Sequence, residues 1–107
     1  MNFNQSYDFV KNVFFARDLS ALKKDFSLMI CLTGEDGGNI YLSYIDGVKY
    51  IEPEKNRTAN ITLTMSMETF SGICSGTIDG LKAFTTGQIQ AKGNVVLAIS
   101  IYNALKS

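Results

Sequence analysis

The stretch that decides the fold is residues 61–99, ITLTMSMETFSGICSGTIDGLKAFTTGQIQAKGNVVLAI. It predicts a half-buried strand, two short helices that each end at a glycine, a second strand and a final apolar segment. Almost every side chain that is predicted to face inward is a hydrocarbon, and no group suited to catalysis interrupts them. The pattern favours a cavity that holds an apolar molecule over a site that makes or breaks bonds.

Two strands are expected in this region. Residues 58–65 give the clearest signal, because apolar side chains alternate with threonines and would occupy opposite faces. Residues 88–92 predict a shorter strand, with Ile89 and Ala91 facing inward and polar side chains facing outward.

The two short helices between these strands carry start and stop signals. Ser66 is expected to cap the first helix, which Gly76 ends. Thr77 is expected to cap the second, with Asp79 in its first turn, where the helix dipole favours a negative charge. Gly87 is expected to end that helix.

The last segment, VVLAISIY at 95–102, has an ambiguous pattern. Its β-branched residues favour a strand. A helix is favoured by the Gly93-Asn94 pair, which is a plausible break and cap, and by a spacing of apolar residues that matches one helix face. We predict a helix here.

The first part of the chain predicts a helix followed by a strand. Apolar residues recur with a helical period over 5–24, and Asn4 and Ser6 are the candidate caps. Residues 26–33 predict a strand that is apolar on both faces, which is typical of a central position in a sheet.

A hairpin is expected next. Residues 40–44 and 48–51 predict its two strands, and the Asp46-Gly47 pair between them is a strong signal for a two-residue turn. Pro53 lies in the polar stretch EPEKNRT at 52–58, which predicts a loop.

These elements predict one α+β domain over residues 1–107. The sheet should have five strands, be mainly antiparallel and carry its helices on one face. The helical crossover between the fourth and fifth strands is long enough to make that pair parallel.

Composition excludes several functional classes. Ten basic residues balance ten acidic ones, so the basic excess of a nucleic-acid-binding protein is missing. The chain has no histidine, which removes the commonest general base and every Ser-His or Cys-His nucleophile. Paired carboxylates, phosphate loops and metal-ligand spacings are also missing, so we expect no enzyme activity, cofactor or metal.

The cysteines and the N-terminus bear on the cellular location. Cys31 and Cys74 each fall in an apolar segment, which favours two reduced core thiols over a disulfide or a reactive thiol. The N-terminal MNFNQSYDF has no secretory signal, and no apolar run approaches the ~20 residues of a membrane span. A cytoplasmic protein is expected.

Two motifs in this chain carry a family resemblance. MSMETF at 65–70, Gly76 and AFTTGQIQAKGN at 83–94 resemble the pattern of the sterol carrier protein type 2 family. The similarity extends over most of the chain. The C-terminal ALKS at 104–107 does not match the peroxisomal signal of eukaryotic members, so peroxisomal targeting is not expected. The chain has little beyond the core domain, and it resembles the stand-alone microbial form, whose ligands need not be sterols.

The resemblance implies an α+β fold with a hydrophobic tunnel between the sheet and the crossover and C-terminal helices. It implies non-covalent carriage of sterols, fatty acids, fatty acyl-CoAs or phospholipids. It also implies that the final segment is a helix.

A tunnel of this kind needs apolar side chains around a gap. Small residues such as Ala91 and Ala98 would leave room for a ligand, although each candidate could instead simply pack in the core. A lipid head group would require a cation nearby, from Lys82, Lys92 or Lys106, whose alternative role is as solvated surface lysines. The candidate ligand-binding residues are Leu63, Met65, Phe70, Ile73, Leu81, Phe84, Ile89, Ala91, Val95, Ile99 and Tyr102.

A second function stays open. With a filled core, the domain could be a protein-interaction or self-association module, and Tyr41, Tyr44 and Tyr50 would then be candidate aromatic anchors. A lipid or other hydrophobic small molecule is the expected partner, with transient membrane contact and a homodimer as further options and no nucleic acid.

Overall fold

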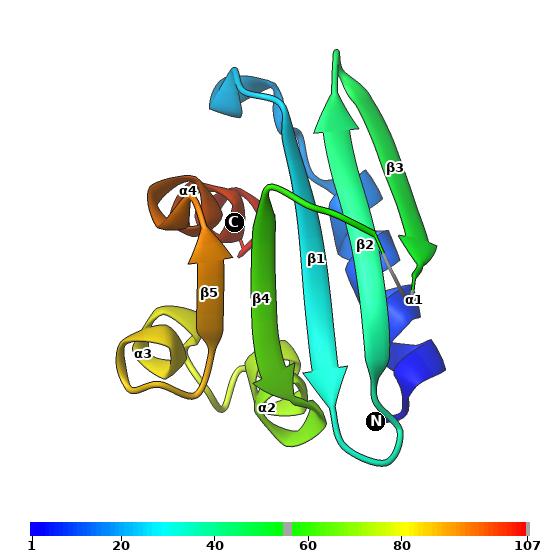
Figure 1. Ribbon diagram of the computed structural model, residues 1–107, viewed down its shortest axis with the longest axis vertical. Coiled ribbons are helices and arrows are strands. Elements are labelled where there is room, and N and C mark those ends of the chain that lie inside the picture. The colour runs from blue at the N-terminus through cyan, green and yellow to red at the C-terminus, as the bar shows by residue number, and fades with distance from the viewer. Residues whose placement is uncertain (55–56, 107) are drawn as a thin grey trace.

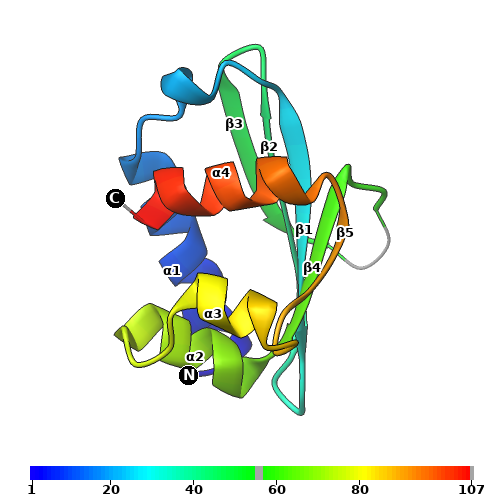
Figure 2. The same cartoon turned by 90° about the vertical axis from the view of Figure 1, so that its left-hand side faces the viewer.

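The computed structural model describes residues 1–54 and 57–106, which form two layers. One layer is a five-stranded sheet with strand order β3-β2-β1-β4-β5, and the helices cover one of its faces (Figure 1 and Figure 2). The α+β class and the one-sided placement of helices are therefore confirmed. Residues 55–56 of the predicted loop at 52–58 lie outside the described residues, as does Ser107.

The first helix, α1, spans Phe3–Ala16. It begins with a capping box, in which Asn2 Oδ1 accepts from Gln5 N at 2.9 Å and Gln5 Oε1 accepts from Asn2 N at 2.9 Å. The predicted caps, Asn4 and Ser6, are therefore wrong. Both lie inside the helix, and the Ser6 hydroxyl donates to the Asn2 carbonyl at 3.0 Å.

The helix also ends earlier than its apolar period predicted. Arg17 has an extended backbone, and Asp18 Oδ1 accepts from Ser20 N at 3.0 Å, a local bond that competes with a continued helix. A 3-10 helix, η1, follows at Ser20–Leu22. Leu19 is nevertheless buried at 1% exposure, so the apolar pattern continues where the α-helix does not.

The central strand is β1, Phe26–Thr33, as predicted. It pairs antiparallel with β2, Gly38–Ile45, and parallel with β4, Ile61–Ser66. Its apolar character on both faces is explained by cover on both sides of the sheet.

The hairpin forms at the predicted turn. Asp46 and Gly47 have φ values of 51° and 77°, the positive values that a two-residue turn of this type requires. The third strand, β3, spans Val48–Pro53, so the prediction that Pro53 lies in a loop is wrong. Proline is tolerated there because β3 is an edge strand.

The direction of the last strand differs from the prediction. β5, Gln90–Gly93, pairs antiparallel with β4, and the parallel pair is β1–β4. The helices α2, Met67–Ser75, and α3, Gly80–Thr85, both lie at the end of the sheet where β4 finishes (Figure 1). Since they do not carry the chain back along the sheet, β5 starts at that same end.

The caps of the short helices are only partly as predicted. Ser66 caps α2, and Gly76 ends it with a φ of 82°. Thr77 does not cap α3, because its hydroxyl donates to the Gly72 carbonyl at 3.2 Å and so helps to close α2. Asp79 is the cap of α3 instead.

The ambiguous final segment is a helix, α4, at Val95–Lys106. Asn94 Oδ1 accepts from Leu97 N at 3.0 Å, as expected of a cap. The preceding Gly93 has a φ of 98°, and a Cβ there would lie 2.0 Å from the Asn60 carbonyl oxygen. Only glycine therefore fits where β5 meets the start of β4.

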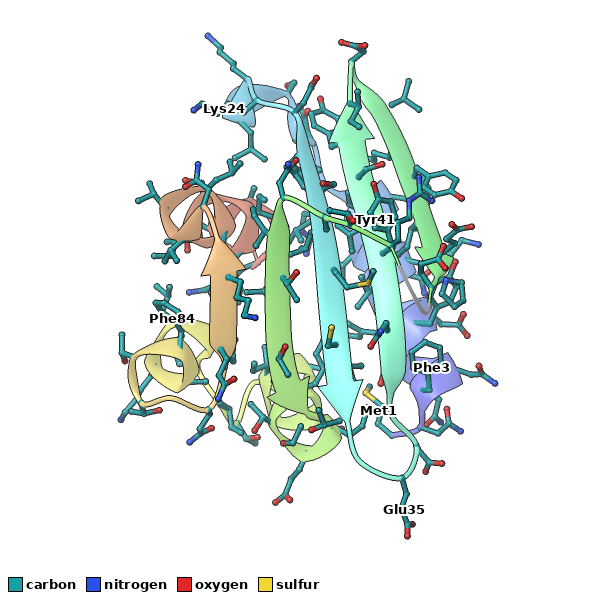
Figure 3. All side chains as sticks on the ribbon, in the orientation of Figure 1. Met1, Phe3, Lys24, Glu35, Tyr41 and Phe84 are labelled. Atoms are coloured by element: carbon teal, nitrogen blue, oxygen red, sulfur yellow. The ribbon has the colours of Figure 1, made fainter. Side chains whose placement is uncertain are left out.

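The helix-free face of the sheet is covered by the chain itself. The segment 57–60 crosses this face, and Figure 3 shows Tyr41 close to it. The Arg57 guanidinium lies 4.1 Å from the centre of the Tyr41 ring and forms an ion pair with Glu52 at 2.8 Å. Tyr41 is consequently buried at 5% exposure.

Candidate ligand-binding cavity

An apolar cavity of about 340 Å³ lies between the helical layer and the sheet. Its floor comes from β1 and β4, and α1, α2 and α4 contribute walls. The floor residues are Leu28, Ile30, Leu63 and Met65. The remaining lining residues are Phe9, Val10, Val13, Arg17, Phe70, Ile73, Cys74, Ile89, Ala98, Ile101, Tyr102, Leu105 and Lys106.

A second cavity, of about 60 Å³, lies beside the first, beneath α3 and α4. Four residues line both cavities and so form the boundary between them: Leu63, Ile89, Ala98 and Tyr102. The residues that line only the smaller cavity are Gly80, Leu81, Phe84, Ala91, Val95 and Ile99.

Each candidate residue from the sequence lines one or both of these cavities. Three of them line the larger cavity only: Met65, Phe70 and Ile73. Three line both cavities: Leu63, Ile89 and Tyr102. The other five line the smaller cavity only: Leu81, Phe84, Ala91, Val95 and Ile99. Sequence patterning thus placed these side chains around space in the fold, while their contact with a ligand stays a prediction.

The wall that sequence reasoning missed is α1. Phe9, Val10 and Val13 line the larger cavity from this helix. The available signal was the width of the apolar stripe, because Phe9 remains 39% exposed and is not needed to pack the helix on the sheet. A stripe wider than the packing contact indicates a second surface for the helix to face.

Two cationic residues at helix ends line the larger cavity. Arg17 follows the end of α1, and Lys106 is the last residue of α4. Arg17 Nε donates to the Leu105 carbonyl at 3.1 Å, which ties the two helix ends together. Of the three lysines considered from the sequence, Lys82 and Lys92 line neither cavity and lie exposed on the surface.

The Cys74 thiol also faces the larger cavity. Burial raises the pKa of Cys74 to about 11, so the side chain remains a neutral thiol near neutral pH. Cys31 lies on the opposite face of the sheet, in register with Asn39 and Thr64. Both cysteines are free and half-buried, so the two thiols are unpaired as predicted but lie at the margin of the core.

Over residues 1–54 and 57–106, no three His, Cys, Asp or Glu side chains gather where they could hold a metal ion. The helices in this part of the chain are also too short or too polar to cross a bilayer.

Comparison with known proteins fits this arrangement of a sheet, one-sided helices and apolar cavities. The sequence profile of the SCP-2 sterol transfer family matches residues 16–106. This chain belongs to that family. The resemblance carried by the motifs at 65–70 and 83–94 is therefore confirmed.

The SCP-2 domain also occurs within longer proteins. The chain is 35% identical over 71 residues to hydroxysteroid dehydrogenase-like protein 2 of Rattus norvegicus. That match covers 65% of this chain but only 14% of the rat protein. The chain thus spans a small part of this relative and matches it through the SCP-2 region.

Solved structures share the SCP-2 fold. The palmitated SCP2L2 from Aedes aegypti has a TM-score of 0.81 at 16% identity, covering 100% of this chain and 96% of that one. The sec-alkylsulfatase Pisa1 from Pseudomonas sp. has a TM-score of 0.73 at 20% identity, covering 92% of this chain and 16% of that one. At these identities the likeness concerns the fold.

Proposed function

We propose that this protein binds one single-chain lipid with an anionic head group, such as a fatty acid, and carries it without chemical change. The observation that carries the proposal is the apolar cavity of about 340 Å³ whose lining includes Arg17 and Lys106. A lipid with a long tail and a negative head matches both parts of this site.

The size of the cavity suits a tail of medium length. It is roughly twice the ~150 Å³ of an engineered apolar cavity that takes up benzene. If one methylene needs about the ~30 Å³ that a water occupies in the liquid, about eleven carbons fill it. A fatty acid near twelve carbons is therefore the best-matched ligand.

Burial of the tail supplies most of the binding free energy. Each methylene removed from water contributes about 0.8 kcal/mol, so ten contribute roughly 8 kcal/mol. Micromolar affinity corresponds to about 8 kcal/mol net, and immobilising the ligand has its own cost. A cavity that already exists in the ligand-free fold and a pair of cations for the head group both help to close that gap.

The cations are placed to receive a carboxylate without being buried themselves. Lys106 is exposed and Arg17 is half-buried, so neither charge carries the full desolvation cost of a core position. The head group would sit at the surface while the tail extends toward the sheet. Palmitate bound to the Aedes aegypti protein of the same fold supports this class of ligand.

The alternative of a docking module with a filled core is less well supported. It requires a closely packed interior, which the cavity of about 340 Å³ contradicts. Its proposed anchor Tyr41 is buried beneath Arg57, so that ring is not available to a partner. The absence of histidine and the hydrocarbon lining likewise favour carriage over catalysis.

A pair of matched substitutions on α4 tests the proposal. Ala98 lines both cavities, whereas Val96 is 75% exposed on the same helix. Calorimetric titration with dodecanoate should show at least a tenfold loss of affinity for Ala98→Phe, because the ring fills the site. Val96→Phe should bind within twofold of the unmodified protein. No binding by the unmodified protein, or equal affinities for the two variants, contradicts the proposal.

A further inference from the structure

The boundary between the two cavities contains one side chain that is fixed at its far end. Tyr102 reaches from α4 to the start of α3, where its hydroxyl oxygen accepts from Gly80 N at 3.1 Å. The other boundary residues, Leu63, Ile89 and Ala98, are apolar and cannot make such a bond. Tyr102 is thus the boundary residue whose position is fixed by a hydrogen bond to another helix.

Gly80 leaves room for this ring because it has no side chain. The residue is buried, and a Cβ built on it would lie 2.6 Å from the nearest carbon atoms of the Tyr102 ring. Any larger residue would therefore push the ring out of its present position. The close approach shows that the ring lies directly against the first turn of α3, and Tyr102 lines both cavities.

The Lys106 ammonium lies 5.7 Å from the centre of the Tyr102 ring, and the hydroxyl is held by one neutral hydrogen bond. Its donor is a helix N-terminal N–H, which has no partner within α3. A neutral hydrogen bond gives only a small net stabilisation because water can replace it, and Tyr102 is half-buried and so within reach of solvent. A ligand tail pressing on the ring could therefore displace it.

We propose that Tyr102 is a gate that sets the length of acyl chain this protein accepts. With the hydroxyl bonded to Gly80, the ring bounds the larger cavity of about 340 Å³ on the side that faces α3. With the ring displaced, the smaller cavity of about 60 Å³ is joined to it and receives the end of a longer tail. This inference rests on the proposed function, since it assigns a role within the same lipid-binding site.

The gate predicts a break in the dependence of affinity on chain length. Up to about eleven buried carbons, each two-carbon extension should raise affinity about tenfold, because the added methylenes leave water. Beyond that length the tail meets the closed ring, and each extension should raise affinity less than twofold. Without the gate, the steep rise should continue for about two more carbons, because the smaller cavity of about 60 Å³ has room for two methylenes at ~30 Å³ each.

The test is a series of saturated fatty acids from eight to eighteen carbons. Each competes with a fluorescent fatty acid at concentrations below micelle formation, so that affinities compare directly. The unmodified protein should show the break near twelve carbons. Tyr102→Ala should move it to about fourteen carbons and raise the affinity for tetradecanoate at least fivefold relative to dodecanoate.

Two further variants show whether a changed profile of Tyr102→Ala comes from the gate or from a folding defect. Tyr102→Phe keeps the ring but removes the bond, and Gly80→Ala keeps the hydroxyl but crowds the ring, so both should weaken the break in the same direction. Tyr7→Phe is the matched control, because the Tyr7 hydroxyl donates to the Ile51 carbonyl at 3.3 Å and Tyr7 lines neither cavity. It should reproduce the unmodified profile.

The two proposals fail in different ways. If the unmodified protein binds fatty acids but folded Tyr102→Ala and Tyr102→Phe retain its chain-length profile, the gate is wrong and lipid carriage stands. A profile without a break in the unmodified protein also overturns the gate. If no fatty acid of any length binds, the proposed function is wrong, and the gate proposal is wrong as well.

Discussion

The part of the core between α1 and strand β2 is dense, whereas the part bordered by α2, α3 and α4, together with one side of α1 and β1, contains cavities. In the dense part Phe14, Phe26, Ile40 and Leu42 are each at most 1% exposed. In the cavity-bearing part, Leu63 and most of the lining residues of α3 and α4 are only partly buried. Both parts rest on the same sheet.

The difference indicates that one part of the core stabilises the fold and the other provides space for a ligand. Close packing on one side supplies stability, which leaves the other side free to remain unfilled. α1 joins the two, since Tyr7 contacts β3 through the Ile51 carbonyl while Val13 faces the larger cavity. Changes in the dense part should therefore act on unfolding, and changes in the cavity-bearing part on ligand binding.

The largest effect is expected for Phe14→Ala in the dense part. Phe14 is 0% exposed, so its truncation should lower the free energy of unfolding by about 3–5 kcal/mol. The neighbouring Phe15 is 51% exposed, and Phe15→Ala should cost less than about 0.5 kcal/mol. Urea denaturation of both variants measures the contrast, and similar losses for the two would remove the distinction between the two parts of the core.

The second prediction probes how dry the larger cavity is. Because burial raises the pKa of Cys74 to about 11 from an ordinary value of 9.0, its alkylation in a Cys31→Ser background should accelerate about tenfold per pH unit from pH 8 to 10. Bound dodecanoate should slow the reaction further. Iodoacetamide labelling followed by mass spectrometry measures the rates.

A rate that levels off near pH 9 would mean that Cys74 is as solvated as a free thiol.

The raised pKa of Cys74 also makes the stability of the fold depend on pH. Above pH 9 the unfolded chain loses the thiol proton while the folded chain keeps it up to about pH 11. Stability should therefore decline as the pH rises through that window.

The third prediction concerns the cationic residues that line the larger cavity. Arg17→Met should lower the affinity for dodecanoate about threefold to fivefold, as expected for a charge pair that water partly screens. Affinity for uncharged dodecanol should not change. Lys24→Met, at an exposed position in η1's C-terminal flank, is the control. Equal losses for the acid and the alcohol would show that Arg17 does not contact the head group.

The smallest effect is expected on the helix-free face. Arg57→Ala removes the guanidinium from the rings of Tyr41 and Tyr50, which should lower the melting temperature by a few degrees. Arg57→Lys should recover little of this, because lysine lacks the planar group that stacks. Dodecanoate affinity should stay within twofold in both, and a larger change would place part of the ligand site on this face.

Much of the fold follows from local patterns in the sequence. The bounds of β1, the turn at Asp46-Gly47 and the cap at Ser66 are all set by residues within a few positions of each other. The side chains around the cavities were also recognisable, because periodicity decides which residues face inward.

The errors arise where local patterns do not decide the outcome. The end of α1 depends on one hydrogen bond between Asp18 and Ser20, which apolar periodicity does not register. The direction of β5 depends on where α2 and α3 lie in space, and the length of the connection alone did not reveal it. Likewise, the role of α1 as a cavity wall and the bond from Arg17 to the Leu105 carbonyl arise only when distant segments meet.

The most direct test of lipid carriage is to locate the bound tail. Isotope-filtered NMR with ¹³C-labelled dodecanoate should give contacts from the tail methylenes to the methyl groups of Leu63 and Ile101, which line the larger cavity. Contacts only to exposed side chains such as Ile45 and Val48 at the hairpin, or none at all, would contradict the account.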